Sequence, residues 1–311
     1  MILGKALAKY LTNTLGIETL KITTLKKFFK TGYLQSIAIN MFLYDDYGIS
    51  KKRDYGKIIS IEEKIKILKG KGMEITDYVF LKNGEIKVPS NIVPESPQFI
   101  IDLGNMDFLL DEEKTSLEQQ IRVSIKTIRE YLFDYNLKLA HTPASFKLEG
   151  RNKIEILNYI PKDNTIVLNP YGEITATEEM IRNTKFFIIG GIVDRGRRLK
   201  NATYELSRRY GYDELPQVKI SLRGSTVGVP DRINSIIEIL LKVLTGYNLE
   251  EAIISTQSNA DKVSRLIREL NTLEKFDYNT IINLKNWLKI NDKLLKLALK
   301  KSKFKAYLSH V

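Results

Sequence analysis

The residues best suited to chemistry lie together in one short stretch, residues 186–198, which reads FFIIGGIVDRGRR. Two adjacent glycines, Gly190 and Gly191, allow the backbone to turn sharply and to approach a ligand closely. Asp194 follows as a lone carboxylate that can accept a proton or stabilise positive charge. Three guanidinium groups suited to phosphate oxygens come next, from Arg195, Arg197 and Arg198. The stretch predicts a carboxylate beside a phosphate-bearing substrate, although a helix capped by Asp194 with solvated arginines fits it equally well.

Two familiar nucleotide-binding motifs are excluded. Gly191 and Gly196 have the spacing of a phosphate-binding P-loop, but Arg197 and Arg198 stand where that motif needs lysine and a hydroxyl group. The G-x-G-x-x-G fingerprint of dinucleotide binding is absent as well. The sequence therefore supports neither a nucleoside triphosphatase nor a nicotinamide-dependent enzyme.

The charge balance indicates a polyanionic partner. The 311-residue chain carries 49 Lys and Arg against 37 Asp and Glu, which gives a formal net charge of +12. Such a surface attracts nucleic acid or an acidic membrane surface, and a lysine-rich chain of a salty or hot cytoplasm is the alternative. The absence of cysteine excludes disulfides, thiolate zinc sites and cysteine nucleophiles, and two histidines are too few for a histidine-rich metal site. We therefore expect no metal.

The sequence shows no membrane segment. It contains no apolar run of about 18 residues, the length that a membrane-spanning helix needs. The N-terminal stretch MILGKALAKYL is interrupted by Lys5 and Lys9 and is too short in apolar residues for a signal peptide. We therefore expect a cytoplasmic protein without a membrane partner.

Composition divides the chain into three expected domains. Residues 1–95 are lysine-rich, contain a predicted β-hairpin around Asn83-Gly84, and end in the proline-containing linker VPESPQ. Residues 96–246 alternate short apolar runs with amphipathic helices, and residues 247–311 have only helical periodicity. We expect a basic α+β N-terminal RNA-binding domain, a catalytic domain and a helical C-terminal domain.

The middle domain has the pattern of an α/β fold with a mostly parallel sheet. Short apolar runs predict buried strands at residues 99–104, 137–143, 165–172, 186–191 and 215–220. Helices are predicted over 117–132, after Thr177, over 199–210 and from about residue 231. In such sheets ligands bind at the carboxyl ends of the strands. Three predicted strand ends carry glycine or proline turns, namely NPYG, GGIVDRG and LRGSTVGVP, and these predict the ligand site.

Together these segments resemble one known family. IIGGIVDRGRR is preceded by VLNPYG and followed by GVPDRI and EILL, and FIIDLGNMDFL with SLEQQI opens the same region. In this order, over residues 98–245, they are similar to the tRNA methyltransferase ten family, the tRNA position-9 N1-purine methyltransferases of the SPOUT class. The basic N-terminal and helical C-terminal portions are most similar to archaeal members.

The resemblance implies a SPOUT-type parallel sheet with a deep trefoil knot, in an enzyme that acts on tRNA as a monomer. It implies S-adenosyl-L-methionine as cofactor, bound by backbone groups of the loops Leu168–Gly172, Gly190–Asp194 and Ile220–Pro230. Carried over by position, the cofactor-binding residues are Leu168, Asn169, Tyr171, Gly190, Gly191, Ile220, Leu222, Gly228, Val229 and Pro230. Packing in the core is the alternative for Tyr171.

The resemblance also places catalytic carboxylates at Asp194 and Asp107. With guanine, N1 carries a proton that Asp194 would accept; with adenine, the carboxylate would stabilise the developing positive charge. Capping of the following helix is the alternative for Asp107, and it is the role we expect of Asp231. Many relatives have aspartate where Asn169 stands, so we expect no catalytic role at that position.

The predicted activity is methylation of N1 of the purine at position 9 of tRNA, with adenine favoured and guanine as a further substrate. The alternatives are a SPOUT enzyme that acts on another RNA and a non-catalytic RNA-binding protein that retains the knot. The candidate RNA contacts are Arg195, Arg197, Arg198, Lys26, Lys27 and Lys30. A solvated helix face is the alternative for the three lysines. We expect His141 to be structural and Trp287 to lie in the core.

Overall fold

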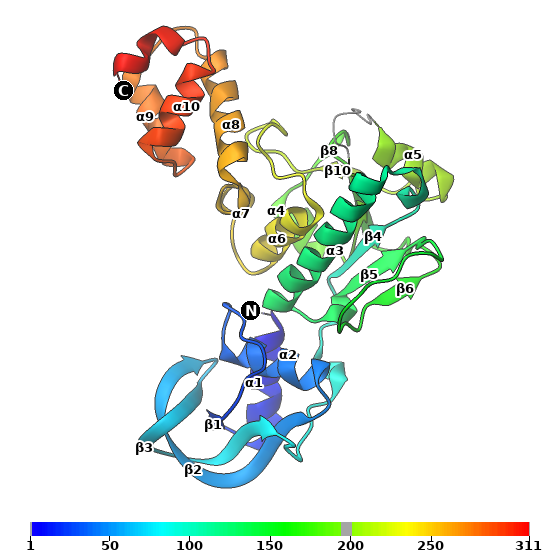
Figure 1. Ribbon diagram of the computed structural model, residues 1–311, viewed down its shortest axis with the longest axis vertical. Helices are drawn as coiled ribbons and strands as arrows, with labels where there is room; N and C mark the ends of the chain where they lie inside the picture. The colour runs from blue at the N-terminus through cyan, green and yellow to red at the C-terminus, as the bar shows by residue number, and fades with distance from the viewer. Residues whose placement is uncertain (1, 194–200, 311) are drawn as a thin grey trace. The chain divides into compact units, whose positions relative to one another are not determined.

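A seven-stranded sheet dominates the computed structural model, which describes residues 2–193 and 201–310 (Figure 1). The strand order is β6-β5-β4-β9-β7-β10-β8, and every strand pairing given for this sheet is parallel. The predicted α/β fold with a parallel sheet is therefore confirmed. The expected trefoil knot involves residues 194–200, which lie outside the described residues, and the knot stays a prediction.

The chain separates into two compact units, one of residues 1–161 with 185–197 and one of residues 162–184 with 198–311. This division differs from the three expected domains because the middle domain contributes strands to both units. The boundaries 1–95, 96–246 and 247–311 stay a prediction.

The first unit begins with two helices, α1 (Ile2–Leu15) and α2 (Tyr33–Leu43), and a three-stranded sheet. In this sheet β3 (Ile65–Lys82) lies between β1 (Thr19–Ile22) and β2 (Tyr47–Glu62), parallel to β1 and antiparallel to β2. The buried leucines of α1 recur every fourth residue, at Leu3, Leu7 and Leu11. This spacing gives α1 one apolar face, which packs in the same buried cluster as α2.

The hairpin predicted around Asn83-Gly84 is wrong. The chain reverses instead at residues 63–64, whose φ values of 48° and 72° form the tight turn between β2 and β3. After Asn83, Ile86 pairs with Ile49 of β2. A Cβ on Gly84 would lie only 2.2 Å from the backbone of β2, so the glycine permits two backbones to cross.

The remainder of the first unit supplies four parallel strands. In sheet order they are β6 (Glu155–Leu157), β5 (Leu137–Ala140), β4 (Gln98–Asp102) and β9 (Phe186–Gly190). The predicted apolar stripe lies on α3 (Asp111–Tyr131) and is buried. Short 3-10 turns are η1 (Ser90–Ile92), η2 (Met106–Phe108) and η3 (Asp134–Asn136). The sequence did not predict β6, since two of its three residues are exposed.

The second unit supplies the remaining strands, β7 (Thr165–Leu168), β10 (Gln217–Lys219) and β8 (Ile174–Thr175). Four helices belong to this part: α4 (Glu178–Asn183), α5 (Ala202–Arg209), α6 (Ile233–Leu244) and α7 (Leu249–Thr256). The hydroxyl of Thr177 accepts the Met180 N–H, so the predicted cap of α4 is confirmed. Gly211, with φ 67°, follows the end of α5 as expected.

Three helices and a 3-10 segment end the chain: α8 (Asn259–Thr272), α9 (Tyr278–Trp287), α10 (Asp292–Lys300) and η4 (Lys305–His310). The three helices lie next to one another (Figure 1) and share one buried apolar cluster, which includes Leu266, Leu270 and Leu295. In the described part of the chain, no helix combines the length and the apolar character that crossing a membrane requires.

Candidate functional site

The turn after β7, Asn169–Gly172, is held by the side chain of its first residue. Asn169 is 5% exposed; its Oδ1 accepts the Tyr171 backbone N–H at 3.0 Å, and its Nδ2 donates to Gln217 Oε1 at 3.1 Å. The Gly172 N–H donates to the Asn169 carbonyl at 2.9 Å. A Cβ on Gly172 would lie 2.4 Å from the Gln217 carbonyl oxygen, so only glycine fits against β10. The turn is therefore fixed before any ligand binds.

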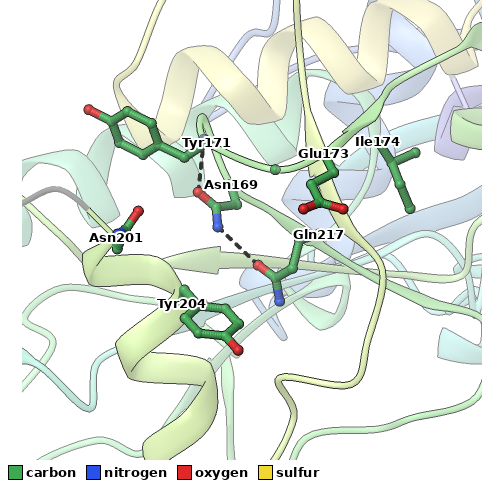
Figure 2. Close-up of a pocket in the computed structure, with 8 residues that line it drawn as sticks. Asn169, Tyr171, Glu173, Ile174, Asn201, Tyr204 and Gln217 are labelled. Carbon is green, nitrogen blue, oxygen red and sulfur yellow. Dashed lines mark hydrogen bonds between the residues drawn. The ribbon is translucent and has the colours of Figure 1, made fainter.

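A pocket of about 400 Å³ opens beside this turn (Figure 2). The residues that line it are Asn169, Tyr171, Gly172, Glu173, Ile174, Asn201, Tyr204 and Gln217. In Figure 2 the amides of Asn169 and Gln217 meet in the centre of the view, with the rings of Tyr171 and Tyr204 on either side. Tyr171 is 60% exposed, so the alternative that packs its ring in the core is wrong. The volume and this mixture of amide and aromatic groups suit a cofactor-sized molecule.

The loop after β10, residues 220–230, buries part of its apolar side chains, whereas Val227 is 43% exposed. Ile220 is 8% exposed and Leu222 only 1%, and Pro230 is buried as well. Leu168, at the end of β7, is 6% exposed. Leu222 and Ser225 exchange backbone hydrogen bonds of 2.8 and 3.1 Å, which close a tight turn. A ligand beside these two loops therefore meets main-chain groups together with the exposed side chains of Tyr171 and Val227.

The glycine turn after β9 is bonded to β4. Gly190 is in parallel register with Asp102, and the Gly191 N–H donates to the Asp102 carbonyl at 2.7 Å. A Cβ on Gly191 would lie 2.7 Å from that same oxygen, so the approach of the two backbones requires glycine. Asp194 and the arginines that follow it lie outside the described residues. The structure thus describes the base of the turn that carries Asp194.

Asp102 is a functional candidate that sequence reasoning missed. Its side chain is fully buried at the carboxyl end of β4, where Oδ1 accepts the Gly104 N–H and lies 2.9 Å from Nδ1 of His141. His141 directly follows β5, the neighbouring strand, and has a left-handed φ of 48°. This contact joins the carboxyl ends of β4 and β5, the edge of a parallel sheet where ligands bind. The signal in the sequence was that both residues are polar positions inside the segments 99–104 and 137–143, which were predicted as strands.

Asp107 and Asp231 are exposed, and neither occupies the helix N-cap position predicted for it. Asp107 lies in η2, and the N-cap of α3 is Leu110. Asp231 precedes Arg232, which is the N-cap of α6. The capping roles expected for Asp107 and Asp231 are therefore wrong, and both carboxylates are accessible to a substrate.

The three lysines predicted to contact RNA lie on one loop. Lys26, Lys27 and Lys30 are exposed between β1 and α2, and we call residues 26–30 the lysine loop. Asn40 of α2 holds this loop, because its Oδ1 accepts the N–H groups of Lys26 and Lys27 at 3.0 and 3.1 Å. The alternative of a solvated helix face is wrong, since the segment is not helical. Phe28 between the lysines is 57% exposed, so the loop offers cations beside an aromatic ring, as single-stranded RNA favours.

The residues present fit S-adenosylmethionine. Gly172 and Gly191 form close backbone approaches that a Cβ would block. Leu168, Ile220 and Leu222 are buried and leave the main chain beside them accessible. The pocket beside Asn169 adds amide donors and acceptors with aromatic rings. Over residues 2–193 and 201–310, no group of histidine and acidic side chains is arranged to hold a metal ion.

Known proteins resemble this chain over most of its length. The family model described as the tRNA (adenine(9)-N1)-methyltransferase N-terminal domain matches residues 1–81. A tRNA (adenine(9)-N1)-methyltransferase of Sulfolobus acidocaldarius is 41% identical over 265 residues, which cover 85% of this chain and 88% of that protein. A tRNA (guanine(9)-/adenine(9)-N1)-methyltransferase of Thermococcus kodakarensis is 31% identical over 192 residues, 57% of this chain and 52% of that protein. The crystal structure of Sulfolobus acidocaldarius Trm10 in complex with S-adenosylhomocysteine has a TM-score of 0.82 and 35% identity, covering 97% of this chain and 99% of that one.

Proposed function

Since the chain belongs to the tRNA (adenine(9)-N1)-methyltransferase family, we propose that it transfers the methyl group of S-adenosylmethionine to N1 of the adenine at position 9 of tRNA. The observation that carries this proposal is the 41% identity with the Sulfolobus acidocaldarius enzyme, which extends over 85% of this chain. The likeness to a structure that holds S-adenosylhomocysteine supports the same cofactor here.

Bound S-adenosylmethionine supplies a methyl group on a positively charged sulfur, so the protein has to align the acceptor nitrogen and manage charge. We assign the binding of this cofactor to the loops Leu168–Gly172, Gly190–Asp194 and Ile220–Pro230. Two observations support the assignment. The buried side chains of Leu168 and Leu222 leave the main chain as the surface that a ligand meets, and Gly172 brings the first loop close against β10.

We assign the catalytic carboxylate to Asp194. Adenine N1 has a free lone pair, so the carboxylate acts by stabilising the positive charge that develops on the ring. With guanine, the same group accepts the N1 proton. Asp107 and Asp231 are further candidates because both are exposed, Asp107 after β4 and Asp231 after the loop that follows β10.

We assign RNA contacts to the lysine loop and to the arginines that follow Asp194. The support is the net charge of +12 and the exposure of all three lysines beside Phe28. Because position 9 lies inside folded tRNA, the target base has to leave its stack to reach the cofactor. We further propose that the chain acts in the cytoplasm and as a monomer. Light scattering on the purified protein measures its molar mass and tests the monomeric state.

The test of the proposed function is methyl transfer from labelled S-adenosylmethionine to two tRNA transcripts that differ only in A or G at position 9. We expect product with A9, and strongly reduced product from the Asp194→Asn variant. Labelling elsewhere in the tRNA, or none with either transcript although the cofactor binds, would overturn the position-9 assignment. Product with both transcripts would establish dual specificity, the second candidate function, which the Thermococcus kodakarensis relative favours.

A further inference from the structure

The loop assigned to the cofactor after β10 is held by the helical end of the chain as well as by the sheet. Gln257, the C-cap of α7, donates from Nε2 to the Gly228 carbonyl at 2.8 Å. Arg265 of α8 donates from Nη1 to the Val227 carbonyl at 3.4 Å. Two consecutive carbonyls of the loop are thus bonded to side chains from α7 and α8.

Gly228 packs directly on α8. Its φ is 79°, and a Cβ there would lie 2.6 Å from Cβ of Arg265 and 2.8 Å from the Asp261 carbonyl oxygen. No other residue type can take this position without a shift of the helix or of the loop. The position of α8 therefore determines where this part of the loop lies.

Arg265 is a fully buried charged residue, and burial of a charge lowers the stability of the fold unless the charge is fully paired. It is 0% exposed, its Nη2 lies 2.8 Å from Glu269 Oε1, and its Nε has no hydrogen-bond partner among the described residues. Burial lowers the pKa of Arg265, and the carboxylate of Glu269 offsets only part of that effect. Replacing a buried charged group by an apolar one is often neutral or stabilising, so its presence beside a ligand loop indicates a positioning role.

The beginning of the same loop is tied to the only tryptophan of the chain. The guanidinium of Arg223 stacks 3.8 Å from the ring centre of Trp287, and it donates from Nε and Nη2 to the Glu250 carboxylate at 3.2 Å each. The indole Nε1 of Trp287 donates to the same carboxylate at 2.8 Å. Residues of the loop, of α7 and of α9 thus form one closed set of contacts.

We propose that Arg265 and Gln257 are positioning residues for S-adenosylmethionine, and that they act by fixing the carbonyls of Val227 and Gly228. We call these two side chains the helical clamp. The inference rests on the proposed function, because it takes the loop Ile220–Pro230 as part of the cofactor site. It gives the helical end of the chain a direct part in cofactor affinity, separate from any contact with tRNA.

The test compares Arg265→Met with Arg268→Ala in the full chain. Arg268 lies on the same helix and also contacts Glu269 at 2.8 Å, which makes it a matched control outside the loop contact. The affinity for S-adenosylhomocysteine is measured by calorimetry without tRNA. We expect Arg265→Met to bind about tenfold more weakly, the low end for a hydrogen bond from a charged donor, and Arg268→Ala to bind as wild type does.

A second variant and a second readout separate positioning from general damage. Gln257→Met removes one bond to the loop and no charge, so it remains informative if Arg265→Met does not fold. Far-ultraviolet circular dichroism shows whether each variant retains its fold, because the Arg265 guanidinium lies 5.3 Å from the Trp287 ring centre and its loss would alter tryptophan fluorescence directly. Hydrogen exchange of the amides of residues 222–229 reports loop order directly, and we expect faster exchange in both clamp variants but not in the control.

The outcomes distinguish the two hypotheses. The helical clamp is overturned if both clamp variants bind S-adenosylhomocysteine within about twofold of wild type and the exchange of the loop amides is unchanged. That outcome would leave the proposed function intact. Failure of the wild-type protein to bind S-adenosylhomocysteine at all would overturn the proposed function, and the clamp with it.

Discussion

Replacing Gly172 by alanine tests the cofactor site where its geometry is most demanding. The new Cβ would lie 2.4 Å from the Gln217 carbonyl oxygen, and ordinary contact begins at 3.4 Å, so the two backbones would have to separate by about 1 Å. Gln217 cannot retreat freely, because β10 is paired with β7 on one side and with β8 on the other. The turn that begins at Asn169 therefore has to move instead.

The magnitude follows from these contacts. Forcing an extra carbon into a packed position costs about 1–3 kcal/mol. Opening the turn also weakens the 2.9 Å hydrogen bond from the Gly172 N–H to the Asn169 carbonyl, a further loss of about 1 kcal/mol. We expect the free energy of unfolding to fall by about 2–4 kcal/mol. Because the displaced turn carries groups assigned to the cofactor, we expect S-adenosylhomocysteine to bind at least about tenfold more weakly, a loss of about 1.4 kcal/mol of binding free energy.

Calorimetry and urea unfolding measure both quantities, and Gly246→Ala is the control. Gly246 has a φ of 113° and open space around it, so alanine there lowers stability through backbone strain of about 1–2 kcal/mol without crowding the turn. We expect this control to bind S-adenosylhomocysteine normally. If Gly172→Ala binds it as tightly as wild type does, the turn after β7 does not hold the cofactor and the reasoning is refuted.

Three other predictions follow from the described contacts. Asp102→Ala removes the acceptor that faces His141 and should lower the free energy of unfolding in urea by about 2–4 kcal/mol, whereas the exposed Asp107→Ala should change it by less than about 0.5 kcal/mol; equal effects would contradict the assigned burial. The pKa of Glu178 is lowered from 4.5 chiefly because its carboxylate accepts the Leu249 N–H, so the stability gained over Glu178→Gln should be present at pH 7 and lost as the pH falls below 4.5; a pH-independent difference in urea titrations would refute this. Alanine at all three lysines of the lysine loop should reduce the slope of log K for tRNA against log salt by about 2–3 in filter binding, and an unchanged slope would remove the loop from the RNA contacts.

The elements of the sheet could be predicted from the sequence because their signals are local. The apolar run before Gly190 and the cap at Thr177 each act within a few residues, and the structure has a strand and a helix at those places. The resemblance then placed the candidate cofactor residues on the turns after β7, β9 and β10. The roles of these residues stay predictions.

Contacts between distant segments could not be predicted in the same way. Pairing of Asp102 with His141 depends on β4 and β5 being neighbours, which the order of apolar runs does not determine. Asn83-Gly84 has the residue types of a hairpin turn, but Gly84 is required because its backbone lies close to that of β2. Arg265 occupies a polar position in an amphipathic helix, and its burial depends on the approach of Gly228 and on the ring of Trp287, both distant in the sequence. In each case the sequence does not show which distant segment packs against the residue in the folded chain.

The inward side chains of the loops after β7 and β10 have a consequence for inhibitor selectivity. Leu168, Ile220 and Leu222 are buried, so replacing them by apolar side chains of similar volume would leave unchanged the main chain that a small molecule meets. Compounds that compete with the cofactor at the main chain would therefore discriminate poorly between related enzymes. The neighbouring pocket offers the contrast, since Tyr171 and Tyr204 expose 60% and 43% of their surface beside it. A molecule extended toward these two rings would depend on side chains, so its affinity would change wherever either tyrosine is replaced.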